Sequence, residues 1–284
     1  MSGSWFPDVW RTETPSSHVK RYALIELASL APSTRTVLFE AFEGDSAYWP
    51  LLNDDKQPHL QREGPWLLEV NEARLDAWRS LATLRCALHA WIESEMTGEQ
   101  LAARLAPAMI IENLAGARSL LRFYLPEIIE QLHAEAPNES RMALFGGLLR
   151  WWYRGHGNEW KALGGLPSSD YAGAWKLQVS DALWVSLHGN AEAMKLVTEF
   201  LEAVPEVFND LCACERPALM VEVLKRADTY GLTRESDRRT FTYLQLTQAK
   251  EVWQTDEMQA LLTQAATGDT SLLELLEPTQ GEPS

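Results

Sequence analysis

The sequence predicts an α+β fold, with an N-terminal lobe in which helices flank a mixed sheet, followed by an all-helical C-terminal lobe. Short apolar runs of strand length alternate with helical periods as far as about residue 155. Several glycines and the turn sequence Pro167-Ser-Ser-Asp170 then interrupt this pattern. Beyond them β-branched runs disappear and helical periods dominate, so we expect a second lobe without strands.

The first lobe is expected to pack around residues 119–155, the stretch richest in large apolar side chains. The run from Leu120 to Leu125 predicts a strand that stops at Pro126, because proline cannot donate to a strand ladder but fits the first turn of a helix. Two helical segments should follow, the second opened by Asn138 and broken at Gly146-Gly147. The aromatic run Leu148–Tyr153 then predicts another strand.

Earlier strands are predicted at Tyr22–Leu27, Pro65–Val70 and Ala87–Ile92, and a hairpin around Gly116 should join residues 109–111 to the run that begins at Leu120. Residues 46–64 are expected to form a loop. Thr97-Gly-Glu-Gln100 matches a capping box, in which the threonine oxygen accepts a backbone N–H and the glutamine reaches back. Helical faces predict the following inward residues: Val37, Leu38, Ala41, Phe42, Leu75, Trp78, Leu81, Leu101 and Leu105.

The second lobe is predicted to be a bundle of five or six short helices. The first should run from Trp175 to Leu187, and the next over Ala191–Ala203 with Asn190 as its cap. Gly231 should end the helix that starts near Arg216, and Ser236 and Thr255 should cap the last two. The expected inward residues are Met194, Val197, Phe200, Leu201, Leu219, Val223, Leu224, Phe241, Leu244, Leu246, Met258, Leu261 and Leu262.

These patterns predict two domains in a chain of 284 residues. We assign residues 1–19 to an N-terminal arm that docks through Trp5, Phe6 and Trp10. The remaining parts are an α/β domain over residues 20–158, a linker over 159–173, a helical domain over 174–278 and a tail over 279–284.

The charge of the chain favours a basic or apolar protein partner. Its formal net charge is -15, so nucleic-acid backbones and anionic membrane surfaces would be repelled. The first residues show no basic region followed by an apolar core, and no apolar run reaches the length of a membrane span. We therefore expect a cytoplasmic protein that neither binds nucleic acid nor inserts into a membrane.

Reaction chemistry is not apparent in the sequence. The six histidines lack a second His or Cys at zinc-ligand spacing, and Gly-x-Ser-x-Gly, P-loop and Gly-x-Gly-x-x-Gly motifs are missing. Cys212-Ala-Cys214 is interpreted as two helix cysteines, and Gly155-His156-Gly157 as part of the boundary. We expect neither catalytic residues, nor a cofactor, nor a metal.

Candidate partner-binding residues are the aromatic side chains Phe123, Tyr124, Trp151 and Trp152. Because alternate residues of a strand face opposite sides, one of Trp151 and Trp152 should enter the core. The other should face a helix layer or a partner. Both alternatives remain open for that second tryptophan, and burial between sheet and helices is the simpler one.

Five motifs occur in an order that resembles the type VI secretion effector chaperones known as Tap or TEC adaptors. They are Tyr22-Ala-Leu-Ile-Glu-Leu27, Gly64-Pro-Trp-Leu-Leu-Glu-Val70, Ile92-Glu-Ser94, Leu121-Arg-Phe-Tyr-Leu-Pro126 and Leu144-Phe-Gly-Gly-Leu-Leu-Arg-Trp-Trp152. In the second lobe, Tyr230-Gly-Leu-Thr-Arg-Glu-Ser-Asp237 resembles a recurring segment of the same family. Two positions depart from the family pattern: Glu26-Leu27 replaces a common Asp-Pro pair, and Leu125 replaces an Asp.

The resemblance implies a bacterial cytoplasmic adaptor without catalytic residues. Such an adaptor binds an effector protein and promotes its loading onto a VgrG or PAAR spike protein before secretion. A hydrolytic enzyme or an immunity protein of the same secretion system is the alternative. Gene neighbourhood would separate these functions, because an adaptor gene should lie between spike and effector genes.

Overall fold

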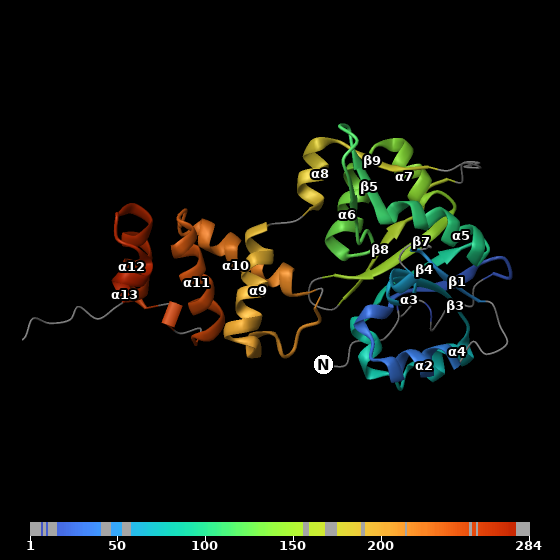
Figure 1. Ribbon diagram of the computed structural model, residues 1–284, viewed down its shortest axis with the longest axis horizontal. Helices are drawn as coiled ribbons and strands as arrows, with labels where there is room; N and C mark the ends of the chain where they lie inside the picture. The colour runs from blue at the N-terminus through green and yellow to red at the C-terminus, as the bar shows by residue number, and fades with distance from the viewer. Residues whose placement is uncertain are drawn as a thin grey trace, which may run out of the picture. The chain divides into compact units, whose positions relative to one another are not determined.

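The structure is a computed structural model, and it divides into two compact units, Met1–Leu187 and His188–Ser284 (Figure 1). Each unit is described by itself. The α+β class predicted from the sequence is confirmed, since strands lie in the first unit and helices make up the second. The described residues are 7, 10, 16–40, 47–52, 58–155, 159–167, 175–188, 191–213, 215–249, 252–253 and 255–276.

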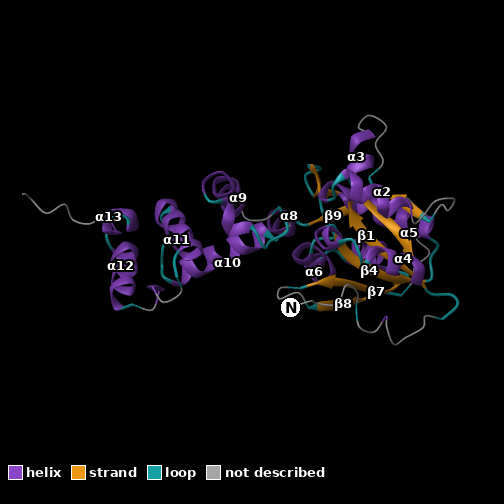
Figure 2. Cartoon of the chain, turned by 90° about the horizontal axis from the view of Figure 1, so that it is seen from below, coloured by secondary structure: helices purple, strands orange, loops and turns teal. Residues whose placement is uncertain are grey.

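The first unit is built on a six-stranded antiparallel sheet, drawn in orange in Figure 2. Its strand order is β2-β3-β1-β4-β7-β8. The central strands are almost wholly buried, which explains why they read as continuous apolar runs. The strands are β1 (Lys20–Glu26), β2 (Tyr48–Pro50), β3 (Pro65–Val70), β4 (Leu88–Ser94), β7 (Leu148–Arg154) and β8 (Trp160–Gly164).

Helices cover both faces of this sheet, as Figure 1 shows. On one face α5 (Gly98–Leu105), α6 (Pro126–Glu135) and α7 (Asn138–Phe145) bury Leu101, Ile129 and Leu144 against Tyr22 and Trp151. On the other face α2 (Pro32–Glu40) and α4 (Glu72–Trp78) bury Leu38 and Trp78 against Ala23, Ile25 and Trp91. Remaining elements of this part are η1 (Leu27–Ser29), α3 (Pro58–Glu63), η2 (Ala82–Cys86) and η3 (Ala106–Met109).

A second, three-stranded sheet completes the first unit, in the order β6-β5-β9. Here β5 (Ile110–Asn113) and β6 (Arg118–Leu120) form the predicted hairpin, in which Gly116 has a φ of 81°. The third strand, β9 (Leu177–Val179), runs parallel to β5 and is followed by α8 (Asp181–Leu187). The prediction that the sheet flanked by helices is mixed is wrong, because that main sheet is antiparallel throughout and only this small sheet contains a parallel pair.

Local caps fix the ends of the elements on the first unit. The predicted capping box is confirmed, because Thr97 Oγ1 accepts from the Gln100 N–H and the Gln100 side chain accepts from the Thr97 N–H. At the end of β4 the buried Ser94 donates to the Gly147 carbonyl and accepts from the Met96 N–H. Ser94, the last residue of β4, thus connects that strand to Gly147, the residue before β7.

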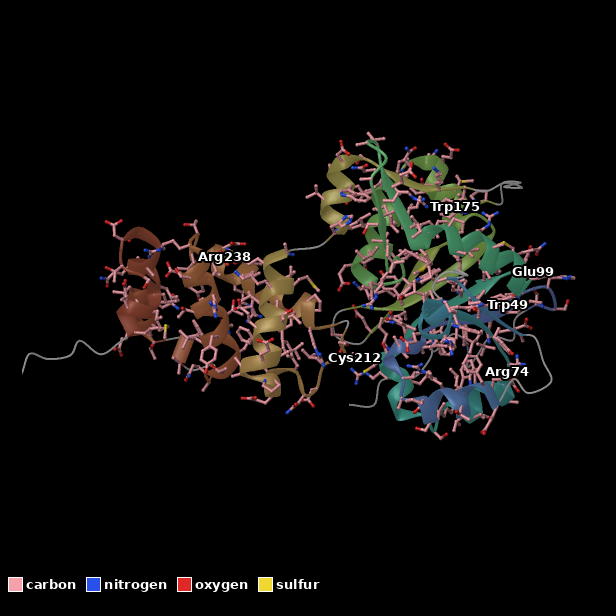
Figure 3. All side chains as sticks on the ribbon, in the orientation of Figure 1. Trp49, Arg74, Glu99, Trp175, Cys212 and Arg238 are labelled. Atoms are coloured by element: carbon pink, nitrogen blue, oxygen red, sulfur yellow. The ribbon has the colours of Figure 1, made fainter. Side chains whose placement is uncertain are left out.

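The second unit consists of short helices packed side by side (Figure 1). Its elements are α9 (Ala191–Ala203), η4 (Pro205–Phe208), α10 (Arg216–Thr229), α11 (Glu235–Thr247), α12 (Asp256–Thr267) and α13 (Leu272–Leu276). Gly231 has a φ of 74° after α10, and Thr255 accepts from the Met258 N–H at the start of α12, both as predicted. Arg238, labelled in Figure 3, joins α11 to Glu192 of α9 and to Asp228 of α10.

The strand predicted at Leu120–Leu125 and the loop predicted over residues 46–64 are both wrong in part. Leu121, Phe123 and Tyr124 do not belong to a strand but to a turn before α6, and all three side chains are buried. Burial of two adjacent residues is incompatible with the alternation of a half-exposed strand, so the apolar run marked a buried turn. Residues 46–64 are not only a loop, since they contain β2 and α3.

The predicted linker over residues 159–173 is also displaced. Residues 160–164 form β8, which pairs with β7 over its whole length, and the two units divide between Leu187 and His188. Trp175–Leu187 is not one helix, because Leu177–Val179 pairs with β5 and only α8 is helical. Pairing between strands so distant in the chain leaves no local signal that separates a three-residue strand from a helical turn.

Some predicted inward residues are exposed. Val37, Met194 and Leu201 face solvent, with exposed fractions of 44%, 51% and 39%. On α9 the buried stripe is Ala193, Leu196, Val197 and Phe200, so the predicted face was rotated by about one residue. The helix α11 begins at Glu235 with Arg234 in the N-cap position, rather than at Ser236.

The termini of the chain were also assigned from the sequence. Trp10 is buried against the first unit, in agreement with the predicted docking of the arm, while Trp5 and Phe6 lie outside the described residues. Ala41, Phe42, Asn190 and the predicted tail over 279–284 also lie outside them.

Candidate functional site

The four aromatic residues predicted to bind a partner occupy different environments. Phe123 and Tyr124 have no exposed surface, and Trp151 is 1% exposed. These three belong to the core between the main sheet and α6, where the ring centroids of Phe123 and Trp151 are 6.0 Å apart. They cannot contact a partner in this structure, and their proposed binding role is corrected to a core role. Only Trp152 is partly exposed.

Trp152 belongs to a surface at the β7–β8 side of the main sheet, which we call the aromatic edge. Strand alternation places Trp151 and Tyr153 of β7 in one core and directs Trp152 to the opposite face. On that face Trp152 pairs in register with Ala162, and Arg154 with Trp160. The aromatic edge consists of Arg150, Trp152, Arg154, Trp160, Ala162 and Gly164.

Two cation–π contacts give the aromatic edge its chemistry. The Arg150 guanidinium lies 5.7 Å from the Trp152 ring centroid, and the Arg154 guanidinium lies 5.0 Å from that of Trp160. Ala162 and Gly164, which face the same side from β8, are small and exposed. Tryptophan and arginine are the residues most enriched at the energetic centres of protein interfaces.

A buried polar cluster lies in the same unit, where β1 ends. Glu26 is the last residue of β1, His89 is the second of β4, and Arg122 and Tyr124 come from the turn before α6. The β1–β4 register shifts between Leu24 and Ile25, opposite Ala90 and Leu88, so His89 is the extra residue of a β-bulge. A bulge re-aims side chains and increases local twist. Here it accompanies a histidine that points at a carboxylate.

The cluster holds the Glu26 carboxylate by several groups. Arg122 Nε lies 3.1 Å from Oε1 and His89 Nε2 lies 3.5 Å from Oε2, while the His89 and Tyr124 ring centroids are 4.8 Å apart. Burial by itself raises the pKa of the Glu26 carboxyl, but its interactions with His89 and Tyr124 and the positive charge of Arg122 outweigh it. The net result is a pKa below the usual value, so Glu26 is ionised at neutral pH.

This arrangement suits an anchor better than an acid–base site. Glu26, His89 and Tyr124 are all buried, and Arg122 is the one member of the cluster with a largely exposed side chain. A substrate would have no path to the carboxylate. The charge instead fastens the turn over residues 121–125 to the end of β1, which holds Phe123 and Tyr124 in the core.

The parts of the chain that the structure describes show no other site with recognisable chemistry. No group of three or more His, Cys, Asp or Glu side chains there could hold a metal ion. No helix among these residues is both long enough and apolar enough to cross a membrane. His156 and Gly157 of the predicted boundary motif lie outside the described residues.

A cavity of about 490 Å³ opens beside α7 and β9, lined in part by Trp175, Glu139 and Lys176. Trp175 is labelled in Figure 3. The Trp175 indole N–H donates to the Arg104 carbonyl, and Lys176 pairs with Glu112. The carboxylate of Glu139, the ammonium of Lys176 and the indole of Trp175 do not together indicate which class of ligand would bind in this cavity.

Most of the aromatic edge was missed from the sequence, although a signal was present. Trp160-Lys-Ala-Leu-Gly164 is a strand-length apolar run that follows Arg154 after a glycine-containing turn, as in a hairpin. The glycines around residue 155 were interpreted as a domain boundary instead. Arg150 and Arg154 become informative only when the register places them beside the two tryptophans.

Comparison with known proteins bears on the first unit. Residues 21–143 match a family model described as a domain of unknown function, DUF4123. The match spans the first four sequence motifs and ends within α7, before β7 and the aromatic edge. No curated protein and no solved structure shows significant similarity to the chain.

Proposed function

We propose that this protein is an adaptor that binds an effector of a type VI secretion system and promotes its loading onto a VgrG or PAAR spike protein. The observation that carries the proposal is the DUF4123 match over residues 21–143, which coincides with the ordered motifs that resemble Tap or TEC adaptors. Binding rather than catalysis also agrees with the burial of the Glu26 cluster. The setting would be the bacterial cytoplasm.

The motifs behind the resemblance act mainly as structural elements in this fold. Ser94 of the Ile92-Glu-Ser94 motif joins β4 to β7, and Arg122 and Tyr124 of the Leu121–Pro126 motif hold Glu26 of the first motif. Trp152, at the end of the fifth motif, is the partly exposed exception. The motifs thus support a common scaffold, and they leave the cargo to be chosen by surfaces such as the aromatic edge.

The proposal is tested by co-expressing the chain with the product of the adjacent large open reading frame and measuring their co-purification. We expect a stable complex with the wild-type chain and a marked loss of complex for Trp152→Ala and Trp160→Ala. Truncating a tryptophan at the centre of an interface typically weakens binding by more than about 2 kcal/mol. Binding of the spike protein is then measured with and without the effector.

Trp175→Ala is the matched control, since Trp175 is also a partly buried tryptophan of the first unit but belongs to the cavity beside β9. It should leave the complex intact. If the chain and the effector candidate do not co-purify, and the chain instead protects cells from that toxin without binding the spike, the immunity alternative replaces the adaptor.

A further inference from the structure

We propose that the outer edge of β8 binds an extended acidic segment of a partner protein as an additional strand of the main sheet. The inference deepens the proposed function, because it specifies how the aromatic edge would hold cargo, but its test does not require an effector. β8 is the last strand in the order β2-β3-β1-β4-β7-β8, so one side of it faces no other strand of the sheet. Edge strands are ready templates for strand addition.

The register shows which backbone groups point outward. The Gly165 N–H donates to the Leu149 carbonyl, and the Gly155 N–H donates to the Glu159 carbonyl. In an antiparallel ladder every second residue pair exchanges hydrogen bonds, so the hydrogen-bonded pairs between these two are Trp151 with Leu163 and Tyr153 with Lys161. Leu163 and Lys161 consequently face β7, while the N–H and C=O of Ala162 point away from it. The Gly164 carbonyl lies 3.1 Å from His133 Nε2 of α6, which leaves the Gly164 N–H directed outward.

The side chains along this edge are suited to a close neighbour. Ala162 and Gly164 are exposed and small, so an added strand could approach Ala162 without displacing a side chain of β8, while the His133 ring stays on the Gly164 carbonyl. A residue paired with Ala162 would extend the cross-strand row of Trp91, Trp152 and Ala162. An apolar side chain at this position would cover the exposed part of the Trp152 ring.

Charge selects the class of partner. In register, Gly164 lies opposite Arg150, which forms no ion pair with another described residue because the carboxylate on its other side, Glu93, is bound by Arg21 at 3.2 Å. A carboxylate on the added strand would reach Arg150 over Gly164, which has no side chain in the way. Arg154, whose guanidinium lies over the Trp160 ring, follows on the same face beyond Trp152. This basic pair is a local exception in a chain of net charge -15.

A second copy of this chain fits the edge less well. Pairing of two β8 edges would place the same arginines and tryptophans on one face of a joined sheet and would supply no carboxylate to Arg150. Like charges on neighbouring strands destabilise their pairing. An extended segment with acidic residues two positions before and after an apolar residue fits better. Its apolar residue would pair with Ala162 beside Trp152, and one of its carboxylates would lie beside Gly164 and reach Arg150.

The test uses the full chain and a fluorescein-labelled peptide, Ser-Glu-Thr-Val-Thr-Glu-Ser, whose palindromic pattern makes it independent of strand direction. The matched probe replaces both glutamates with lysine. In fluorescence polarisation at low salt we expect saturable binding of the acidic peptide and at least about tenfold weaker binding of the basic one. Hydrogen exchange should show protection of the Ala162 and Gly164 amides by the acidic peptide alone.

Two variants locate the interaction. Ala162→Pro removes an outward N–H that β7 does not use, and it should weaken acidic-peptide binding at least about tenfold, whereas Ala162→Ser should change it less than about twofold. Arg150→Glu, a change at an exposed position, should reverse the preference between the two peptides. Thermal unfolding checks that each variant is folded, and Arg150→Glu keeps the test decisive if the proline variant is not.

The inference is overturned if the acidic peptide does not bind at about 5 mM, if both peptides bind alike, or if neither variant changes binding. It is also overturned if light scattering shows a dimer that Ala162→Pro dissociates, because a second copy would then occupy the edge. Effector binding that is unaffected by Ala162→Pro removes the strand-addition inference and leaves the adaptor proposal standing. If the acidic peptide binds but the chain forms no complex with the effector, the strand-addition inference stands and the adaptor proposal falls.

Discussion

Glu26 keeps its negative charge although its carboxylate is 8% exposed, because Arg122, His89 and Tyr124 supply the interactions that water would otherwise provide. Such a group makes folding depend on pH. The native state lowers the pKa of the Glu26 carboxyl below that of the unfolded chain, so in acid the unfolded state binds the proton more readily. The stabilisation is therefore complete above the unfolded pKa and disappears as the pH falls through the folded one.

We predict that Glu26→Gln lowers the free energy of unfolding at pH 7, and that the difference from wild type shrinks as the pH falls below the ordinary value of 4.5. Urea unfolding at pH values from about 3 to 7 measures this. Glu135→Gln, a change at an exposed position on α6, is the control and should show little difference at any pH. A Glu26→Gln penalty that stays constant from neutral to acid pH would contradict the assigned ionisation.

Two adjacent glycines show how differently the backbone can be packed at neighbouring positions. A Cβ on Gly165 would lie 1.6 Å from the Leu148 carbonyl oxygen, whereas a Cβ on Gly164 would meet no atom within 4 Å. The obstacle at Gly165 is main chain and cannot rotate away. Gly165 follows β8 at the point where its N–H binds the Leu149 carbonyl, so a displacement there separates β8 from β7.

Gly165→Ala should therefore destabilise the first unit by roughly 1–3 kcal/mol or more, while Gly164→Ala should be nearly neutral. Chemical denaturation monitored by tryptophan fluorescence compares the two variants directly. Equal effects of the two substitutions would show that the close approach of Gly165 to β7 is not maintained in solution.

At the level of elements, the segment Tyr230–Asp237 needs specific residues at several positions, because it ends one helix and fixes the packing of three others. Gly231 ends α10 in the left-handed region, and Leu232 then returns to the core, where its N–H donates to the Ala227 carbonyl. Arg234 and Asp237 next join three helices. Arg234 donates to the carbonyl of Ala265 in the last turn of α12 and to those of Asp269 and Thr270 after it. Asp237, which is 1% exposed, accepts from the Leu272 N–H at the start of α13.

Arg234→Ala is predicted to cost roughly 3–5 kcal/mol, because it leaves the buried Asp237 carboxylate without its ion-pair partner at 2.7 Å. Arg226→Ala is the control, since Arg226 forms a surface pair with Glu222 of the same helix and should cost less than about 1 kcal/mol. Thermal unfolding of both variants measures the difference. Similar melting temperatures of the two variants would mean that the Arg234–Asp237 contacts contribute little to the packing of α12 and α13.

Elements with local signals were predictable from the sequence, and those defined by distant pairing were not. The Thr97 capping box, the Gly116 hairpin and the Gly231 helix end depend on a few neighbouring residues, and all three are confirmed. β9 was missed because its only strand partner is β5, far away in the sequence. The candidate site followed the same rule: aromatic content drew attention to Trp151 and Trp152, but only the register separates the core residue from the surface one.

On the scale of the whole molecule, the first folding unit is longer than the matched domain. The DUF4123 match ends at residue 143, but Leu148, Trp151 and Tyr153 of β7 and Leu177 and Val179 of β9 are buried in the same core as Tyr22 and Leu24. Without β7 the largely buried strand β4 would have one edge without a strand partner. The compact unit extends to Leu187.

We predict that a fragment of residues 1–158 does not unfold cooperatively, whereas a fragment of residues 1–188 does. The shorter piece lacks β8, β9 and α8, and it leaves large apolar side chains of the core uncovered. Circular dichroism during heating and binding of a hydrophobic dye compare the fragments. A cooperative transition in the shorter piece would show that β9 and α8 are dispensable.

The parallel pairing of β5 with β9 also sets the order of events during synthesis. Ile111 leaves the ribosome 66 residues ahead of its partner Leu177, so the hairpin of β5 and β6 must wait with one edge unpaired. At translation rates of about 5–20 residues per second this interval lasts several seconds, far longer than a hairpin needs to form. During those seconds the nascent chain exposes a strand edge and part of its core. The newly made chain is therefore most prone to aggregate in the interval before Leu177–Val179 emerges and covers the edge of β5.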